Sequence, residues 1–266
     1  MRRAMALVRA RWLVAMSYRM DTFFSFLGMV LALIPLYFIS HALQPIMTNA
    51  IRMEAPEYFG YLMIGLITYT FVQAAVNELH GALSSEIGTG SFEALVATPT
   101  SLPVLLAGLV GQAFTVNTIR AVLVLVFSWM LGAHIVWTHG LAAVGVLALI
   151  VLAYLPLGVL AAALVMAFRT TGPFPSAVIG ISVLMGGVYY PTTVIPSWLE
   201  RVSVFVPLTY GLRSLRRALL DGAPLAASAR DLATLAGFAV VLSIVSLAAF
   251  SAALKYAKHA GTLAQY

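Results

Sequence analysis

Long apolar runs constrain the fold of this chain more than any other feature of its sequence. About 20 consecutive apolar residues suffice to cross a bilayer as a helix. Six runs approach or exceed that length, at 22–43, 58–79, 104–132, 140–167, 174–190 and 232–254. In lipid every backbone polar group must be satisfied within the protein, and these runs far exceed the roughly ten alternating residues of a barrel strand. They predict an all-α, polytopic membrane protein with six transmembrane helices.

Composition excludes several other classes of protein. The chain is 62% hydrophobic and 9% charged, whereas soluble domains carry about a quarter charged residues. It contains no cysteine, and its five histidines show no metal-binding spacing on one helix, so we expect no metal site. The net charge of +6 comes mostly from arginines beside apolar runs, where membrane lipid explains them better than nucleic acid does.

Charged residues next to the first and last runs predict the orientation. Positive charge is usually retained in the cytoplasm. The flanking basic residues are Arg2, Arg3, Arg9, Arg11, Arg19, Lys255 and Lys258. We therefore expect both termini in the cytoplasm, which makes segment 191–231 external. That segment carries five arginines, against the rule, but it also carries three acidic residues, and the first span usually dominates orientation.

Glycine and proline interrupt the fifth run and the external segment after it. The fifth run begins after Gly172-Pro173 and is broken at Gly186-Gly187. A short, broken span followed by further apolar residues indicates re-entry into the bilayer from outside. Within 191–231 we expect two short helices, interrupted at Pro196 and Pro207. No repeat or linker is visible, so the chain is predicted to be one domain, 1–266.

The connection 84–101 between the second and third spans has its own pattern. Ser91 can cap the start of a short helix, and Thr98-Pro99 stops it, because the residue before proline avoids helical geometry. Such a helix on the cytoplasmic surface could transmit a push from a soluble partner into two spans. A plain connecting loop is the alternative.

Two motifs carry a resemblance to a known family. From Glu86 the chain reads E-x-G-T-G-S-F-E-A-L-x-x-T-P-x-S, and the external segment contains P-x-W-L from Pro196 and P-L-T-Y from Pro207. Together they resemble the type 2 family of ATP-binding-cassette (ABC) transporter permeases. The first motif resembles the coupling segment of that family, with Ser84-Ser85 in place of an upstream basic residue. Segment 1–21 resembles the family's interfacial N-terminal helix.

The resemblance implies a permease subunit of an exporter in a bacterial inner membrane. Two copies of the chain, as a homodimer, would form the substrate path, and two separate ATPase subunits would bind ATP and Mg. This chain would then bind no cofactor and would not be an enzyme. A phosphate-binding loop needs a lysine after glycines, and neither Lys255 nor Lys258 follows one. The resemblance suggests a drug, a lipid-linked compound or a glycan as substrate.

Two groups of residues are candidates for function. The expected coupling element consists of Glu86, Gly88, Thr89, Gly90, Phe92, Glu93, Thr98 and Pro99. The expected path or gate consists of Asn117, Arg120, Tyr189, Tyr190, Pro196, Trp198, Pro207 and Tyr210.

Arg120 and the outer aromatic residues also have purely structural explanations. Arg120 is the clearest candidate, because a charge at mid-bilayer costs about 2.5–3.5 kcal/mol on insertion scales. It could instead be satisfied by bonds between helices or by snorkelling, and the outer aromatic residues could form an interfacial belt. We expect Gln73, Asn77 and Glu78 to be interfacial or packing groups.

Two rival classes remain. A secondary transporter or channel would favour paired intramembrane carboxylates, whereas all nine Asp and Glu residues lie near span ends or in loops. A membrane-embedded enzyme would need a convergent catalytic set such as Ser/His/Asp, and no such set is visible in this sequence. An assembly scaffold would tolerate Glu93→Ala, whereas a coupling role predicts loss of transport in a protein that still inserts and folds.

Overall fold

The computed structural model describes residues 19–88, 102–168 and 170–259, and the regular structure in these ranges is helical. The longer helices are α2 (Arg19–Ile51), α3 (Tyr58–Gly88), α5 (Leu102–Met130), α6 (Gly140–Phe168), α7 (Phe174–Met185), α8 (Ser197–Ser203), α9 (Pro207–Leu219) and α10 (Ala229–His259). Short 3₁₀ helices are η1 (Trp137–His139), η2 (Thr192–Val194) and η3 (Leu225–Ser228). The predicted all-α fold is confirmed.

In the described ranges, five helices are long and apolar enough to cross a membrane. They contain the stretches Phe26–Ile51, Tyr58–Ala82, Ala113–Met130, Trp137–Phe168 and Leu225–Tyr256. The fifth predicted span is shorter than expected, because α7 has 12 residues, or about 18 Å against a bilayer core of about 30 Å. Helix α7 ends at Gly186, and Gly187 has a φ of +83°, a left-handed conformation that glycine adopts without strain. Six complete spans therefore stay a prediction.

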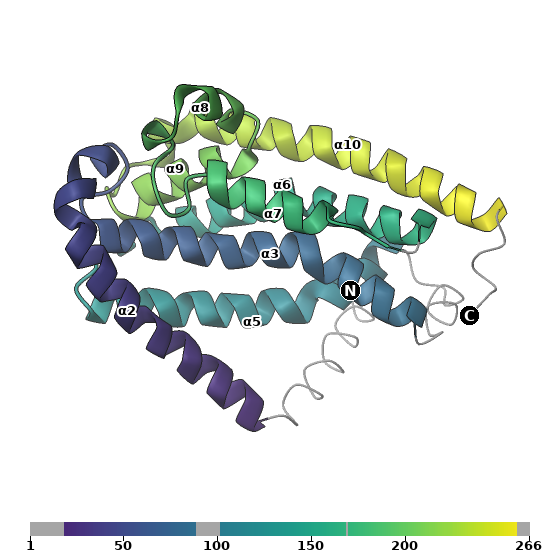
Figure 1. The fold of residues 1–266 in the computed structure, drawn as a ribbon, viewed down its shortest axis with the longest axis horizontal. Helices are drawn as coiled ribbons and strands as arrows, with labels where there is room; N and C mark the ends of the chain where they lie inside the picture. The colour runs from purple at the N-terminus through teal and green to yellow at the C-terminus, as the bar shows by residue number, and fades with distance from the viewer. Residues whose placement is uncertain (1–18, 89–101, 169, 260–266) are drawn as a thin grey trace.

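Helices α3 and α6 lie at the centre of the bundle (Figure 1). Helix α10 packs along α6, while α5 and α2 pack against α3. Most of α3 is buried, whereas α2 and α10 expose large apolar side chains such as Phe38 and Ile244. Apolar side chains on an outer face suit a helix that faces lipid.

Several hydroxyl groups on these apolar helices are satisfied within their own helix. Thr68 donates to the carbonyl of Ile64 at 2.8 Å, and Ser182 donates to that of Val178 at 2.7 Å. The intrahelical bond removes the cost of an unpaired polar group in an apolar environment. These hydroxyls are therefore compatible with burial and do not by themselves mark a site.

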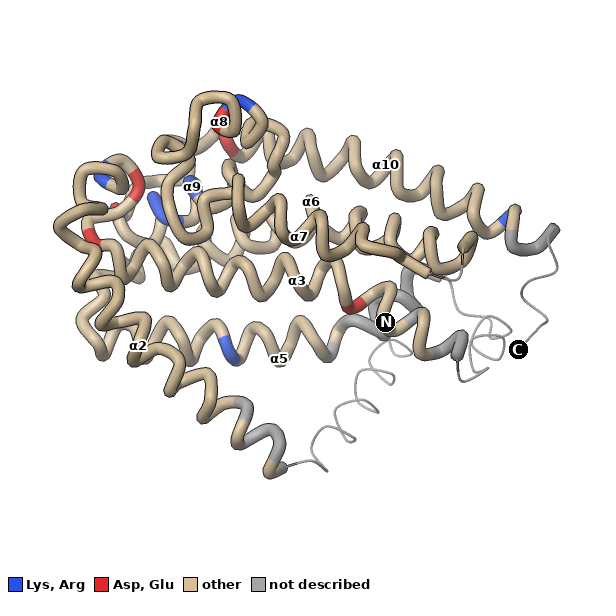
Figure 2. Tube along the Cα trace, viewed as in Figure 1, with Lys and Arg blue, Asp and Glu red and all other residues tan. Residues whose placement is uncertain are grey.

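Most charged residues of the described ranges lie at one end of the bundle, around α8, α9 and the α2–α3 connection, and a few others lie along α3, α5 and α10 (Figure 2). The last residues of α3 and α10 lie towards the opposite end (Figure 1). Helix α8 begins directly after Pro196, and α9 begins at Pro207, so the two prolines start the two short helices. Re-entry of these helices into a bilayer stays a prediction.

Three of the five arginines in 191–231 face carboxylates. Arg216 pairs with Glu54 at 3.1 Å, and Arg213 and Arg217 lie 3.6 and 3.8 Å from Asp231. Because these carboxylates neutralise part of the positive charge, the arginines count less against an external location of the segment. The orientation of the chain stays a prediction.

Close packing of α3 and α6 generates a test of the fold. A Cβ atom added at Gly158 would lie 2.3 Å from the carbonyl oxygen of Ala75, whereas nothing lies within 4 Å of one added at Gly145. We expect Gly158→Ala to lower stability by about 1–3 kcal/mol, the usual cost of overpacking. Gly145→Ala on the same helix is the control and should be neutral or slightly stabilising. Thermal unfolding in detergent measures both, and equal midpoints would contradict the packing.

Candidate functional site

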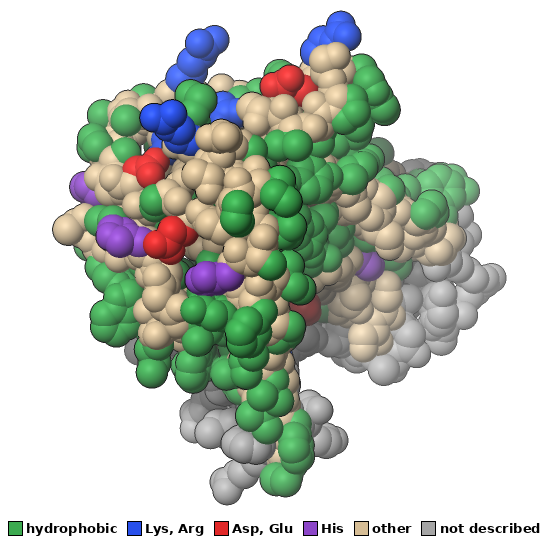
Figure 3. Space-filling view, turned by 60° about the vertical axis from the view of Figure 1, so that its left-hand side comes forward, with side chains coloured by type: hydrophobic (Ala, Val, Ile, Leu, Met, Phe, Trp, Pro, Cys, Tyr) green, Lys and Arg blue, Asp and Glu red, His purple; other side chains and the backbone are tan. Residues whose placement is uncertain are grey.

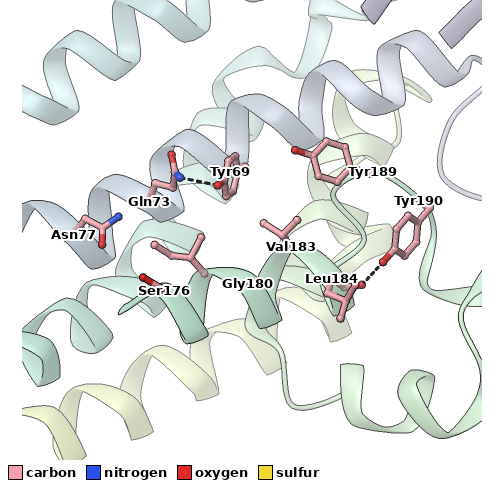
Figure 4. A pocket seen from close by; sticks show the side chains of 10 residues that line it. Tyr69, Gln73, Asn77, Ser176, Gly180, Val183, Leu184, Tyr189 and Tyr190 are labelled. Carbon is pink, nitrogen blue, oxygen red and sulfur yellow. Dashed lines mark hydrogen bonds between the residues drawn. The ribbon is translucent and has the colours of Figure 1, made fainter. Parts of the chain in front are cut away.

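A cavity of about 770 Å³ lies between α3 and α7. Its lining combines polar and aromatic residues with apolar ones (Figure 4). The residues are Tyr69, Gln73, Asn77, Ser176, Ile179, Gly180, Val183, Leu184, Tyr189 and Tyr190. The cavity is open at one side, so it forms a hollow in the surface of this chain. Its α3 residues lie within the stretch Tyr58–Ala82, which is long and apolar enough to cross a membrane.

The α3 wall is a polar stripe. Tyr69, Gln73 and Asn77 are spaced by four residues, which brings them onto one helix face. All three are half-buried, and the amide nitrogen of Gln73 donates to the hydroxyl oxygen of Tyr69 at 2.6 Å (Figure 4). The neighbouring residues of α3 are largely buried and apolar. The stripe is therefore the side of α3 that the chain itself leaves open.

The other wall comes from α7 and the loop that follows it. Gly180 is open towards the cavity side, with nothing within 4 Å of an added Cβ. At one end of the cavity, Tyr190 donates its hydroxyl to the carbonyl of Leu184 at 2.9 Å (Figure 4). The carbonyl of Tyr189 accepts a bond from the Tyr58 hydroxyl at 2.9 Å. The side chain of Tyr190 and the backbone of Tyr189 are thus positioned by bonds to α7 and α3.

A buried arginine holds this loop against α3. Arg216 on α9 is 1% exposed, and its Nη2 donates to the carbonyls of Gly187 at 2.8 Å and Val188 at 3.2 Å. Its Nη1 donates to Glu54 at 3.1 Å. The guanidinium carbon lies 3.3 Å from the ring centroid of Tyr61, within the range of a cation–π contact. One side chain therefore joins α9, α3, the α2–α3 connection and the loop after α7. This set of contacts is here called the Arg216 junction.

Close backbone approach reinforces the same junction. A Cβ added at Gly65 would lie 2.2 Å from the carbonyl oxygen of Val188, so only glycine fits there without a shift. The hydroxyl of Tyr61 donates to the carbonyl of Gly187 at 2.9 Å. The loop that leads to Tyr189 and Tyr190 is consequently fixed to α3, which also carries the polar stripe.

The path and gate candidates from the sequence occupy different places. Tyr189 and Tyr190 line the cavity. Arg120 and Asn117 are half-buried on α5, outside the cavity lining, and the Arg120 guanidinium carbon lies 5.8 Å from the Phe26 ring.

The remaining candidates belong to the external helices and to the coupling segment. Pro196 precedes α8, on which Trp198 is 61% exposed, Pro207 begins α9, and Tyr210 lines a separate pocket beside α10. Glu86 and Gly88 lie in the last turn of α3. The other coupling candidates lie outside the described residues: Thr89, Gly90, Phe92, Glu93, Thr98 and Pro99.

Sequence reasoning missed the α3 stripe and Arg216. The interval of four between Tyr69, Gln73 and Asn77 was a usable signal. Arg216 lies four residues after Leu212 and eight after Leu208, so a helical projection puts it on the apolar face of α9. A charge on an apolar face indicates a buried partner. Within the described ranges, no three His, Cys, Asp or Glu side chains come close enough to hold a metal.

Comparison with known proteins identifies the class. The profile of the family described as ABC-2 type transporter matches residues 3–220. The chain therefore belongs to the ABC-2 type transporter family and is a multi-pass membrane subunit of an ABC transporter, and the family implies partnership with an ATPase subunit.

One curated relative is also similar. Nodulation protein J of Rhizobium leguminosarum bv. viciae is 25% identical over 201 residues, which cover 74% of this chain and 76% of the relative. The alignment is consistent with the family assignment over most of the length of both proteins.

The Arg216 junction predicts a large loss of stability on substitution. Arg216→Gln leaves Glu54 without its cation and weakens the bonds to the loop carbonyls. We expect a loss of about 3 kcal/mol, towards the lower end for broken buried pairs, because the Glu54 side chain keeps 15% exposure. The control is Arg201→Gln on the exposed part of α8, which should change stability by less than about 0.5 kcal/mol. Thermal unfolding in detergent compares them, and an unchanged midpoint for Arg216→Gln would refute the junction.

Proposed function

We propose that this chain is the permease subunit of an ABC exporter and that the α3–α7 cavity is its half of the substrate path. The polar stripe of Tyr69, Gln73 and Asn77 supports the proposal most directly. Polar side chains within a membrane span are costly when they face lipid. A cavity that presents them on an open side suits passage of a solute better than contact with acyl chains.

A second copy of the chain would complete the path. The cavity opens at the surface between α3 and α7, whereas α2 and α10 expose continuous apolar surface that suits lipid. Two copies placed with their α3–α7 faces together would enclose both polar stripes and remove them from lipid. This arrangement supports a homodimer with one central path.

Helix α3 offers a mechanical route from the ATPase to this path. It has 31 residues, or about 46 Å as one rod. It starts beside the Arg216 junction, carries the stripe in its middle, and ends with Glu86 and Gly88 at the start of the proposed coupling segment. We propose that ATP and Mg, bound by two ATPase subunits, drive movement that enters through 86–99. Because Arg216 ties the Tyr189–Tyr190 loop to α3, the stripe and the loop would move together.

The lining of the cavity favours an amphipathic substrate. Ile179, Val183 and Leu184 supply apolar contacts, while Gln73 and Asn77 supply amides. Tyrosine rings can stack on a sugar or on an aromatic ring. We therefore propose a drug, a lipid-linked compound or a glycan as the substrate. Outward transport and a bacterial inner-membrane location, with both termini in the cytoplasm, follow from the resemblance and from the charge pattern.

A transporter driven by an ion gradient is the main rival. Coupling to protons or Na⁺ usually employs ionisable groups in the membrane interior. Of the ten residues described around the cavity, none is Asp or Glu. Full transport in ATP-free liposomes, by the chain alone, would favour this rival and would contradict the proposal.

The amides of the stripe are predicted to contact substrate. The chain is reconstituted with its ATPase partner, and a panel of amphipathic drugs, glycolipids and glycans is tested for stimulation of ATP hydrolysis. Gln73→Leu and Asn77→Leu should each raise the half-stimulating concentration about tenfold, the effect of losing one good polar contact. Basal hydrolysis should stay unchanged.

Thr115→Val is the matched control for these variants. Thr115 is exposed on α5 and donates its hydroxyl to Gly111 of its own helix, so it offers nothing to the cavity. Its half-stimulating concentration should match that of the unmodified chain. Equal values for Gln73→Leu, Asn77→Leu and the control would contradict a role of the stripe in binding.

A further inference from the structure

A second hollow, here called the arginine pocket, lies between α9 and α10, away from the α3–α7 cavity. Its volume is about 450 Å³. It is lined by Tyr210, Arg213, Arg217, Ala227, Ser228, Arg230, Asp231 and Thr234. None of these residues belongs to the lining of the α3–α7 cavity, and the proposed path makes no use of them.

Positive charge dominates the arginine pocket. Among its described lining residues, three arginines share the pocket with one carboxylate, that of Asp231. Asp231 lies 3.6 Å from Arg213 and 3.8 Å from Arg217, distances longer than a hydrogen bond. The carboxylate therefore screens the two guanidinium groups without using their capacity to donate. Arg230, exposed at the pocket edge, adds a third charge, so the pocket retains an excess of two positive charges.

Partial burial strengthens the attraction of two of these arginines for anions. Arg213 and Arg217 are 33% and 28% exposed. Guanidinium groups that are partly withdrawn from water bind an oxyanion more strongly than fully solvated ones do, because water competes less.

The pocket also lies at the edge of the lipid-facing surface. Exposed apolar side chains on α10 include Val240, nine residues or about 14 Å beyond Asp231. The ring of Tyr210 packs against Phe238, with centroids 6.1 Å apart, as is typical near a membrane interface. In the space-filling view, charged side chains gather at the same end, next to a broad hydrophobic surface (Figure 3).

We propose that the arginine pocket binds a phosphate group, and that the group belongs to the head of an anionic membrane lipid. Planar guanidinium groups match the oxygens of a phosphate and can bind them in pairs. A purely structural cluster would pair each arginine with its own acid, whereas here Arg213 and Arg217 share the carboxylate of Asp231. The charge of Arg217 also acts on the carboxyl of Asp221, which lies outside the lining. The proposal is independent of the substrate path, since it concerns a different face of the chain.

Lipid retention in nanodiscs tests the proposal. The full chain is reconstituted in a mixture of phosphatidylglycerol and phosphatidylcholine, and native mass spectrometry counts the lipids that stay bound. Retention of phosphatidylglycerol should fall about threefold to tenfold in Arg213→Gln and in Arg230→Gln, as expected for the loss of one charge-assisted contact. Arg201→Gln is the control, because Arg201 is an exposed arginine at the same end of the molecule but outside the pocket. Equal retention in all three variants overturns the proposal.

Two further arms separate the alternatives. Asp231→Asn removes the carboxylate from the described lining of the pocket, so phosphatidylglycerol retention should rise. If the arginine cluster were purely structural, the same variant should lower phosphatidylglycerol retention. Inorganic phosphate is tested by thermal unfolding in detergent, against chloride at equal ionic strength. A rise in midpoint that Arg213→Gln abolishes, without any selectivity for phosphatidylglycerol, would overturn the lipid as the source and leave a site for free phosphate.

Discussion

The buried guanidinium of Arg216 is the interaction on which the rest of the structure depends. An arginine that is 1% exposed is stable only if its donors are matched, and here a carboxylate, backbone carbonyls and an aromatic ring match them. Those partners come from three separate parts of the chain, and Arg216 itself lies on a fourth. Their common attachment determines where the loop after α7 lies, and hence where the cavity ends.

The roles proposed for this chain and for its ATPase partner follow from this junction. Helix α3 passes through every element of the proposed mechanism, from Tyr61 at the junction through Gln73 at the cavity to Glu86 near its end. Energy would enter from ATPase subunits outside the chain, so the membrane subunit needs only a rigid connection and a polar face. The arginine pocket lies apart, between α9 and α10, where a bound lipid would hold the external helices at the membrane surface.

Part of the fold and of the candidate site could be predicted from the sequence, for physical reasons. A membrane span depends on local apolar length, so the long helices were predictable, and Pro196 and Pro207 marked the two short helices because proline restricts the backbone locally. The Arg216–Glu54 pair joins residues 162 positions apart, and no local pattern encodes such a pairing. The sequence predicts that Gln73 and Asn77 are interfacial or packing groups. It does not reveal that they line a cavity, because the direction in which a helix face points is set by its neighbours in the fold. The extent of α7 was overestimated for a related reason: hydropathy continues to Tyr190, but the left-handed Gly187 ends the helix.

The central claim is that the α3–α7 face closes on a second copy to form a path. The chain has no cysteine, so single cysteines can be introduced without background, and Gly180 has space for one. In native membranes, a short bifunctional thiol reagent should join two copies of Gly180→Cys, and ATP should change the yield when the ATPase is present. Ile244→Cys, on a lipid-facing position of α10 that is 65% exposed, should stay monomeric. Cross-linking of Ile244→Cys with none for Gly180→Cys would contradict the account.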